Sequence, residues 1–238
     1  MRWYRRLPKP AALSFDLDDT LYDNTPVMRR AEQALRAYLH QEWPATQSLA
    51  PSYWRDCRDH VLSRQPRLAT DMGALRLHTL THGLSLAGCK EPQLSRLVED
   101  AFNHFYAVRS DFKVDKTICS LLSRCAQRWP LVAITNGNVN LKAIGIADYF
   151  DLCLHANLQQ PMKPDGTMFT IAQQHLDLPA QHILHIGDNL EKDVMGARRA
   201  GYSTAWYAHN RPMSLQHEPV QVLPDIQLDT LDELLELA

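Results

Sequence analysis

Phe15-Asp16-Leu17-Asp18-Asp19-Thr20-Leu21 places three carboxylates within four positions, directly after an apolar run that begins at residue 11. Asp16 and Asp18 are two residues apart, so in an extended chain their side chains point the same way. Two like charges this close need a cation or a shared proton, and Mg²⁺ takes oxygen ligands of this kind. A lone Asp at a strand end is more often part of an acidic turn. The alternation here instead predicts a strand that ends in a metal-dependent site.

Further short apolar runs follow, separated by stretches of helical periodicity, which is the pattern of a parallel sheet covered by helices. The five predicted strands are residues 11–16, 131–136, 151–157, 182–188 and 203–208. Three of them end in a polar residue ahead of a loop, at Asp16, Asn136 and Asp188. Ligands of open α/β sheets bind beyond the carboxyl ends of the strands. We therefore expect these three residues to meet in one crevice.

The long separation between the first two predicted strands indicates an insertion. Residues 24–112 lack strand patterning and show helical periodicity. We predict an α/β fold in which residues 1–23 and 113–238 form a Rossmann-like parallel-sheet core. An all-helical cap of about four helices, residues 24–112, lies over the crevice. A short strand near Ile226 and a last helix with a capping box of Thr230 and Glu233 complete the chain.

A second acidic group follows the fourth predicted strand, in Gly187-Asp188-Asn189-Leu190-Glu191-Lys192-Asp193. Asp193 alone could be a helix-start carboxylate favoured by the helix dipole, but together with Asp16 the group predicts a metal site. Thr135, Asn136 and Lys163 lie between the two acidic groups in the sequence. Singly, Thr135 suits a strand residue and Lys163 a solvated loop cation. Together they form a donor set facing a metal-bound anion, which is what phosphoryl transfer requires.

The composition is that of an ordinary globular protein and disfavours several partner classes. The 238 residues are 45% hydrophobic and 22% charged, with a formal net charge of −2, so the charge gives no reason to expect nucleic-acid binding. The five cysteines are scattered and never spaced C-x-x-C, which favours a reducing compartment over a disulfide framework or a zinc site. No apolar run suits a signal sequence or a membrane helix. We expect a soluble, cytoplasmic protein without a membrane partner.

The order of these motifs resembles that of the haloacid dehalogenase superfamily. D16-x-D18-x-T20, Thr135, Lys163 and G187-D188-x-x-x-x-D193 follow one another as the four motifs of that superfamily do, over essentially the whole chain. The strings ALSFDLDDTLYDN and WPLVAITNGN look most like bacterial flavin mononucleotide phosphatases that also act on the phosphorylated ribitylamino-uracil intermediate of riboflavin synthesis. The resemblance implies a Mg²⁺-dependent phosphomonoester hydrolase acting on small phosphorylated metabolites, these two compounds among them.

The resemblance also implies roles for particular residues. Asp16 would attack phosphorus and become an aspartyl phosphate, and Asp18 would act as general acid and then as general base. Mg²⁺ would be held by the Asp16 carboxylate, the Asp18 backbone carbonyl and Asp188, with Asp193 supporting the site. The phosphoryl oxygens would be bound by three further groups, namely Thr135, the backbone amides near Asn136, and Lys163.

Three other functions compete with this interpretation. Dehalogenases of the superfamily lack a carboxylate two residues after the nucleophile, and Asp18 is present here. A phosphosugar mutase would differ only in how its cap excludes water, so that reading stays open. A receiver-like signalling domain also surrounds an aspartyl phosphate with acidic residues, a Thr and a Lys. Such a domain is much shorter and has no helical insertion of this size.

Weaker signals point to the cap. His78 and His82 are four residues apart but lack the carboxylate of an H-E-x-x-H motif, so we expect them outside the site. Four aromatic residues and two arginines are candidates for stacking on a planar substrate ring, although helix packing is the commoner role of such side chains: Tyr22, Trp43, Tyr53, Trp54, Arg58 and Arg76. The sequence does not distinguish a monomer from a homodimer.

Overall fold

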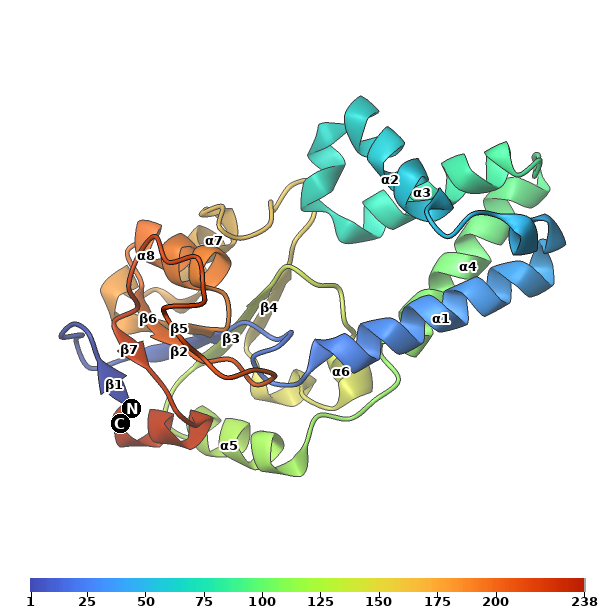
Figure 1. The fold of residues 1–238 in the computed structure, drawn as a ribbon. Helices are drawn as coiled ribbons and strands as arrows, with labels where there is room; N and C mark the ends of the chain where they lie inside the picture. Colours follow the sequence, from blue (N-terminus) through green and yellow to red (C-terminus); the bar gives the residue numbers. More distant parts are fainter. Residues whose placement is uncertain (238) are drawn as a thin grey trace.

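The computed structural model describes residues 1–237 as a sheet with helices on both faces and a separate group of helices beside it (Figure 1). The sheet has seven strands in the order β1-β7-β6-β5-β2-β3-β4, and all neighbours pair in parallel except β1 with β7. The strands are β1 Arg2–Trp3, β2 Ala12–Phe15, β3 Leu131–Thr135, β4 Leu152–His155, β5 Ile183–Gly187, β6 Ser203–Trp206 and β7 Ile226–Gln227. The predicted fold class is confirmed.

The central strands are buried on both faces, which is why they appear in the sequence as short continuous apolar runs. In β2, Leu13 and Phe15 pack into one hydrophobic cluster with α5 (Lys116–Ala126), whereas Ala12 packs into another with α7 (Thr167–Leu176). Each of the five predicted strands is present, slightly shorter than expected, and the short strand near Ile226 is also present. The sequence analysis missed β1, whose two exposed residues pair with β7.

The remaining segments of the core are short. They comprise α6 (Leu141–Ile144), a π-helical turn over Leu190–Met195, α8 (Gly196–Arg199), and 3₁₀ turns at Ala147–Tyr149 and Ala180–His182. The last predicted helix is a 3₁₀ helix, Leu231–Leu237. At its start the Glu233 carboxylate accepts hydrogen bonds from the backbone N–H groups of Asp229 at 2.7 Å and Thr230 at 3.4 Å. The carboxylate arm of the predicted capping box is therefore formed.

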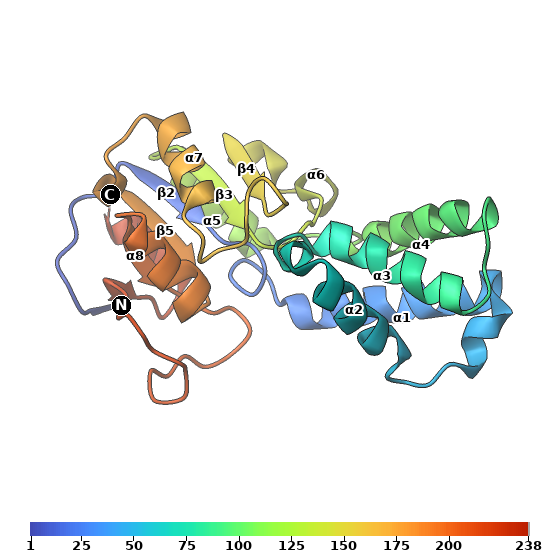
Figure 2. The ribbon, with the colours of Figure 1, turned by 90° about the horizontal axis from the view of Figure 1, so that it is seen from above.

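Four α-helices lie between β2 and α5, beside the sheet (Figure 2). They are α1 (Asn24–Glu42), α2 (Tyr53–Arg64), α3 (Met72–Leu86) and α4 (Gln93–Arg109), with 3₁₀ turns at Pro44–Ser48 and Pro66–Thr70. Helix α4 packs against α1 and α3, and α2 packs against α3. Leu35, Leu84 and Phe105 belong to the shared apolar cluster of this cap. The residue limits that divide cap from core remain a prediction.

Two of the four cap helices, α1 and α3, begin at capping side chains that the sequence provides. The Asp23 carboxylate accepts a hydrogen bond from the N–H of Thr25 at 2.9 Å, and the Asp71 carboxylate accepts one from Ala74 at 2.9 Å. Such caps satisfy N–H groups that the first helical turn leaves free. Within residues 1–237, none of the helices combines the length and apolarity needed to span a bilayer.

Close packing between α2 and α3 predicts a strong effect of one added methyl group. A Cβ atom on Gly83 would lie 2.4 Å from Cζ3 of Trp54, so Gly83→Ala must displace the indole ring. We expect a loss of about 1–3 kcal/mol in the free energy of unfolding, measured by urea denaturation. At Gly73, in the same helix, an added Cβ would meet its nearest atom at 3.4 Å. Gly73→Ala should cost nothing, and equal effects at both positions would contradict this account.

Candidate active site

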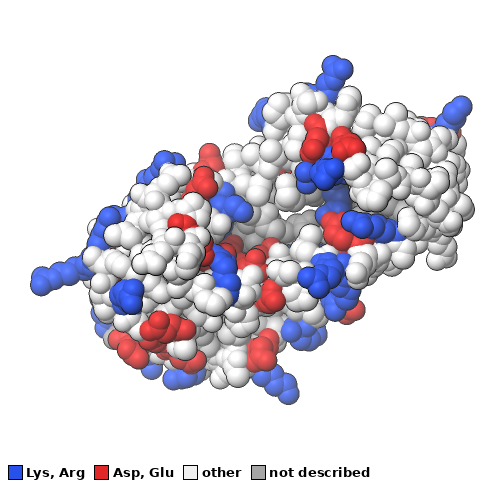
Figure 3. Space-filling view, viewed as in Figure 1, with Lys and Arg blue, Asp and Glu red and all other residues white. Residues whose placement is uncertain are grey.

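A cleft of about 720 Å³ lies between the cap and the carboxyl ends of the sheet strands. Figure 3 shows the molecule hollowed between its two parts, with acidic and basic side chains gathered around the opening. The structure brings every predicted site residue to this cleft: Asp16, Asp18, Thr135, Asn136, Lys163, Asp188 and Asp193. The convergence expected from the parallel sheet is therefore present.

Asp16 follows β2 directly, and its N–H donates to the carbonyl of Ile186 on the neighbouring strand β5 at 2.8 Å. The chain then turns, because the N–H of Asp19 donates to the Tyr22 carbonyl at 2.9 Å and Asp19 adopts a positive φ of 63°. Aspartate tolerates this left-handed conformation better than most residues. The turn leaves the Asp16 side chain buried at the bottom of the cleft, with 7% of its surface exposed.

The ammonium group of Lys163 lies between two carboxylates. Its Nζ is 2.7 Å from Oδ1 of Asp16 and 2.7 Å from Oδ1 of Asp193, and the lysine is 2% exposed. The Asn136 carboxamide fixes the backbone of Lys163, accepting from its N–H at 2.8 Å and donating to its carbonyl at 2.9 Å. The side chain of Asn136 therefore positions Lys163. Only the backbone of Asn136 is left to face a ligand.

Three carboxylates form a group that could hold a metal ion. Asp16, Asp188 and Asp193 each offer an oxygen atom within 4.8 Å of the others. Gly187 permits this approach, because a Cβ atom there would lie 2.3 Å from Cγ of Asp193. Arg211 donates to the Asp188 carboxylate at 2.7 Å. The Asp18 carboxylate is not part of this group, and a role for its backbone carbonyl remains a prediction.

Burial and mutual repulsion shape the charges of this group. Burial raises the pKa of Asp16 well above its usual range. The Lys163 charge lowers this pKa, and the neighbouring carboxylates of Asp193 and Asp188 raise it further. Burial and Asp193 also raise the pKa of Asp188 to about 6, against the pull of Arg211. For Asp193 the effect of burial is outweighed by Lys163, which holds its pKa well below the usual range. A bound cation would relieve the repulsion at Asp16 and Asp188, so the donor set fits a divalent metal.

Asp18 is held by two donors on one oxygen. The Tyr22 hydroxyl donates to Oδ1 at 2.6 Å and Nη2 of Arg109 donates to the same atom at 2.7 Å. Burial raises the pKa of Tyr22 well above its usual range, and nearby Asp18 adds to this, so the phenol stays protonated and donates. Sequence reasoning missed Arg109, because one arginine at a helix end, 91 residues away, carries no recognisable pattern.

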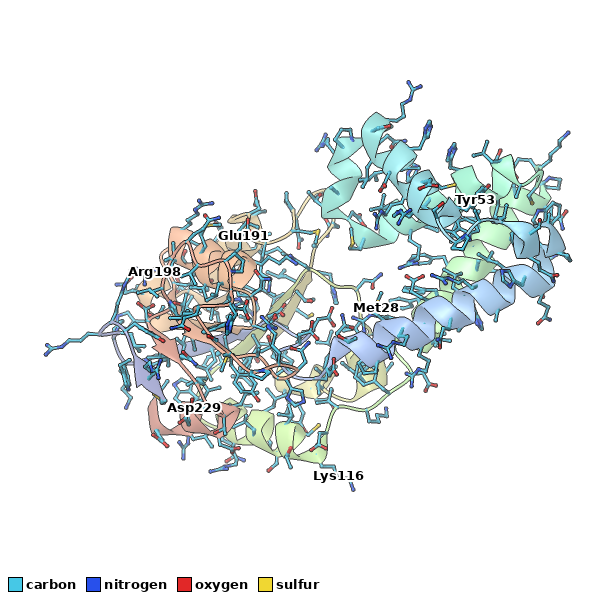
Figure 4. All side chains as sticks on the ribbon, in the orientation of Figure 1. Met28, Tyr53, Lys116, Glu191, Arg198 and Asp229 are labelled. Atoms are coloured by element: carbon cyan, nitrogen blue, oxygen red, sulfur yellow. The ribbon has the colours of Figure 1, made fainter. Side chains whose placement is uncertain are left out.

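The cap contributes only some of the residues considered from the sequence. Trp54, Arg58 and Arg76 line the cleft. Trp43 and Tyr53 have packing roles instead, since the Trp43 indole donates to the Ala87 carbonyl at 3.0 Å and the Tyr53 hydroxyl donates to the Gly83 carbonyl at 2.6 Å. In Figure 4 the cleft-lining Met28 marks the core end of α1 and Tyr53 lies farther out in the cap.

Other predictions for the cap are also resolved. The Tyr22 ring packs against Phe112 with centroids 4.8 Å apart, and Tyr22 is not among the residues that line the cleft. His78 and His82 lie outside the cleft as expected, and His82 stacks on His60 with ring centroids 4.3 Å apart. A cleft-lining aromatic that the sequence analysis missed is Phe105, whose ring has the Arg76 guanidinium 3.6 Å above its centroid.

The fold and this site define a hydrolase class, and comparison with known proteins agrees. The chain belongs to the haloacid dehalogenase-like hydrolases, whose family model matches residues 10–201. It is 34% identical to the 5-amino-6-(5-phospho-D-ribitylamino)uracil phosphatase YigB of Escherichia coli (strain K12), with 100% of both chains covered. It is 26% identical to a ribulose-1,5-bisphosphate 5-phosphatase of Halopiger xanaduensis, covering 95% of this chain and 98% of that one. As predicted, the protein is a phosphoric monoester hydrolase.

Solved structures show the same fold. A 2-haloacid dehalogenase from Pseudomonas syringae pv. Tomato DC3000 superposes with a TM-score of 0.87 at 30% identity, covering 96% of this chain and 97% of that one. The magnesium-bound putative hydrolase YfnB of Bacillus subtilis superposes with a TM-score of 0.65 at 19% identity, over 97% of this chain and 99% of that one. At that identity the second likeness concerns the fold alone.

The close approach at Gly187 predicts a linked loss of stability and of metal binding. In Gly187→Ala the new methyl group must displace Asp193 from Lys163, and breaking such a buried pair costs about 3–5 kcal/mol. We expect a lower melting temperature and a much smaller rise in that temperature on adding Mg²⁺ than in the unaltered protein. Gly166→Ala, where an added Cβ meets no atom within 4 Å, is the control. An unaltered Mg²⁺ response in Gly187→Ala would contradict the proposed geometry.

Proposed function

We propose that this protein is a Mg²⁺-dependent phosphomonoesterase that works through an aspartyl phosphate on Asp16. The observation that carries the proposal is the position of the Asp16 carboxylate, which is buried at the bottom of the cleft against Lys163. A carboxylate in this place can attack a phosphorus atom brought into the cleft. Lys163 offsets the repulsion between this carboxylate and an incoming phosphate dianion.

The reaction has two steps. In the first, a carboxylate oxygen of Asp16 bonds to phosphorus, the ester P–O bond breaks, and Asp18 gives its proton to the departing alkoxide. In the second, Asp18 takes a proton from water, which attacks the aspartyl phosphate and releases inorganic phosphate and free Asp16. The two donors on Oδ1 of Asp18 support this role, because they leave Oδ2 as the oxygen that exchanges the proton.

The phosphoryl group is bound by Thr135, Lys163 and the backbone amides near Asn136. The Thr135 hydroxyl already accepts a hydrogen bond from the N–H of Gly137 at 3.0 Å, so its own proton is free to donate to a phosphoryl oxygen. Fixed donors around the transferring group are the main requirement of phosphoryl transfer.

Mg²⁺ is held by Asp16, the backbone carbonyl of Asp18 and Asp188, with Asp193 in support. The three clustered carboxylates and the raised pKa values of Asp16 and Asp188 support a divalent cation there. When bound, the ion supplies charge neutralisation to the phosphoryl group.

The substrates proposed are small phosphorylated metabolites, with the phosphorylated ribitylamino-uracil intermediate of riboflavin synthesis and flavin mononucleotide foremost. The full-length likeness to a phosphatase named for that intermediate supports the choice. The cleft is also large enough for such molecules, and Trp54 and Phe105 line its cap side. Aromatic side chains in a cleft wall suit a planar ring in the leaving group.

Dehalogenation is the second candidate, favoured by the likeness to the Pseudomonas syringae structure. Asp18 argues against it, because the cleft presents a second carboxylate held for proton exchange, which displacement of a halide does not need. A panel of 2-haloacids tested for halide release separates the two activities.

The decisive experiment measures phosphate released from flavin mononucleotide, the phosphorylated ribitylamino-uracil, and a panel of sugar and nucleotide monophosphates. We expect release with Mg²⁺ and none with chelator. Asp16→Asn should lower kcat by about three orders of magnitude or more, because it removes the nucleophile. The matched control is Asp177→Asn, an exposed residue in the left-handed conformation that asparagine also tolerates.

Two results would contradict the proposal. Phosphate release that survives in Asp16→Asn would exclude the aspartyl phosphate. Absence of release from every ester by the folded, Mg²⁺-loaded protein would favour the mutase or the dehalogenase.

A further inference from the structure

We propose that His185, held in place by Ser14, is a positioning residue of the active site: it donates a hydrogen bond to Asp193 and thereby lets Lys163 turn from that carboxylate to a phosphoryl oxygen. The inference rests on the proposed function and adds two residues to it. Ser14 and His185 form a polar pair buried inside the sheet, and the proposed reaction gives neither of them a role.

Ser14 and His185 are register partners on the neighbouring strands β2 and β5. They are 0% and 1% exposed, and Oγ of Ser14 lies 2.9 Å from Nδ1 of His185. Two residues earlier on the same strands, Ala12 and Ile183 pack with Phe169 of α7 in an apolar cluster. The edge of one ring meets the face of the other between Phe169 and His185, with centroids 5.0 Å apart. A polar pair in such an apolar layer needs a partner for each of its groups.

Asp193 is the partner of the second imidazole nitrogen, since its Oδ1 lies 3.3 Å from Nε2 of His185. The effect of burial on the pKa of Asp193 is outweighed by Lys163, so the carboxylate is ionised and can only accept. Nε2 therefore carries a proton. Burial and the nearby Lys163 charge lower the pKa of His185 to about 4, so the imidazole is neutral and its Nδ1 accepts. The Ser14 hydroxyl donates to Nδ1 and fixes this tautomer.

The ammonium group of Lys163 has three N–H donors, and it contacts three acceptors. Oδ1 of Asp16 and Oδ1 of Asp193 each lie 2.7 Å from Nζ, and the third acceptor is the carbonyl of Ile134. To bind a phosphoryl oxygen, Lys163 has to give up one of these contacts. Asp16 is the nucleophile beside which the lysine has to stay, so Asp193 is the acceptor that it can release.

Asp193 keeps two other donors when Lys163 turns away. Its Oδ1 accepts from His185, and its Oδ2 accepts from the N–H of Asn189 at 2.9 Å. A buried charged acceptor that loses its donors is costly, and the remaining hydrogen bonds reduce this cost. Without His185, Oδ1 of Asp193 would depend on Lys163 alone. The phosphoryl group would then compete less well for the lysine.

Three substitutions of His185 test this role. His185→Leu removes both hydrogen bonds, His185→Gln keeps an amide N–H near the position of Nε2, and His185→Asn places its amide near Nδ1 instead. We measure the affinity of the Mg²⁺-loaded protein for inorganic phosphate by calorimetry, and kcat for p-nitrophenyl phosphate. In the Leu and Asn variants both should fall about tenfold or more, as is typical when a supporting hydrogen-bond partner is removed from a site. His185→Gln should restore most of both, because it keeps the donor to Asp193.

A second variant and a control separate positioning from packing. Ser14→Ala leaves the imidazole in place but removes the hydroxyl that fixes its tautomer, so it should lower both quantities in the same direction by a smaller factor. It also serves as the test if His185→Leu does not fold. Ile183→Val is the control, because Ile183 lies in the same strand and in the adjoining apolar cluster. It should lower the melting temperature without changing phosphate affinity or kcat.

Two results would overturn the inference. The first is phosphate affinity and kcat that stay unchanged in His185→Leu and Ser14→Ala. The second is a His185→Gln variant as impaired as His185→Asn, which would mean that His185 serves packing alone. A folded, unaltered protein that binds phosphate but does not hydrolyse p-nitrophenyl phosphate with Mg²⁺ present overturns the proposed function instead. In that case the phosphate affinities of the variants still decide the role of His185.

Discussion

The buried ammonium group of Lys163 is the interaction on which the site depends. It lies 2.7 Å from each of two carboxylates, Asp16 and Asp193, that would otherwise repel one another in a place that water hardly reaches. Asp16 follows β2, Lys163 lies after β4, and Asp193 lies in the turn after β5. The lysine can therefore reach both carboxylates only if the strands are in this order. The carboxamide of Asn136 adds a further constraint by clamping the lysine backbone. The same strand order that defines the sheet is thus needed to assemble the active site.

Much of the core could be predicted because strands that are buried on both faces appear in the sequence as short, largely apolar runs. Strands such as β2 and β3 are buried at every position and mostly apolar, and the polar residues that follow them had to meet at one edge of a parallel sheet. Strand β1 has no such apolar pattern, since its two residues are exposed and owe their conformation to pairing with β7. The final helix was recognisable from Thr230 and Glu233, but its 3₁₀ geometry was not.

The cap shows where sequence reasoning stops. Trp43, Tyr53 and Trp54 are all helix-associated aromatics of one short stretch, and only the tertiary packing shows that Trp54 alone of them lines the cleft. Arg109 and Arg211 reach the carboxylates of Asp18 and Asp188 from 91 and 23 residues away. An isolated arginine is most often a solvated surface cation, so nothing in the local sequence marks these two.

The packing of α1 along α4 has a consequence for how such a protein changes over evolution. Because the chain leaves the core at Asn24 and comes back at Arg109 along two helices that lie side by side, the cap is an excursion that starts and ends near the same point (Figure 1). Insertions with neighbouring ends are tolerated well by the host fold. Cap helices can therefore be lengthened, shortened or exchanged while the strands keep their register. Changes in the cap can then alter which substrate binds, while the core residues that carry out the reaction stay the same.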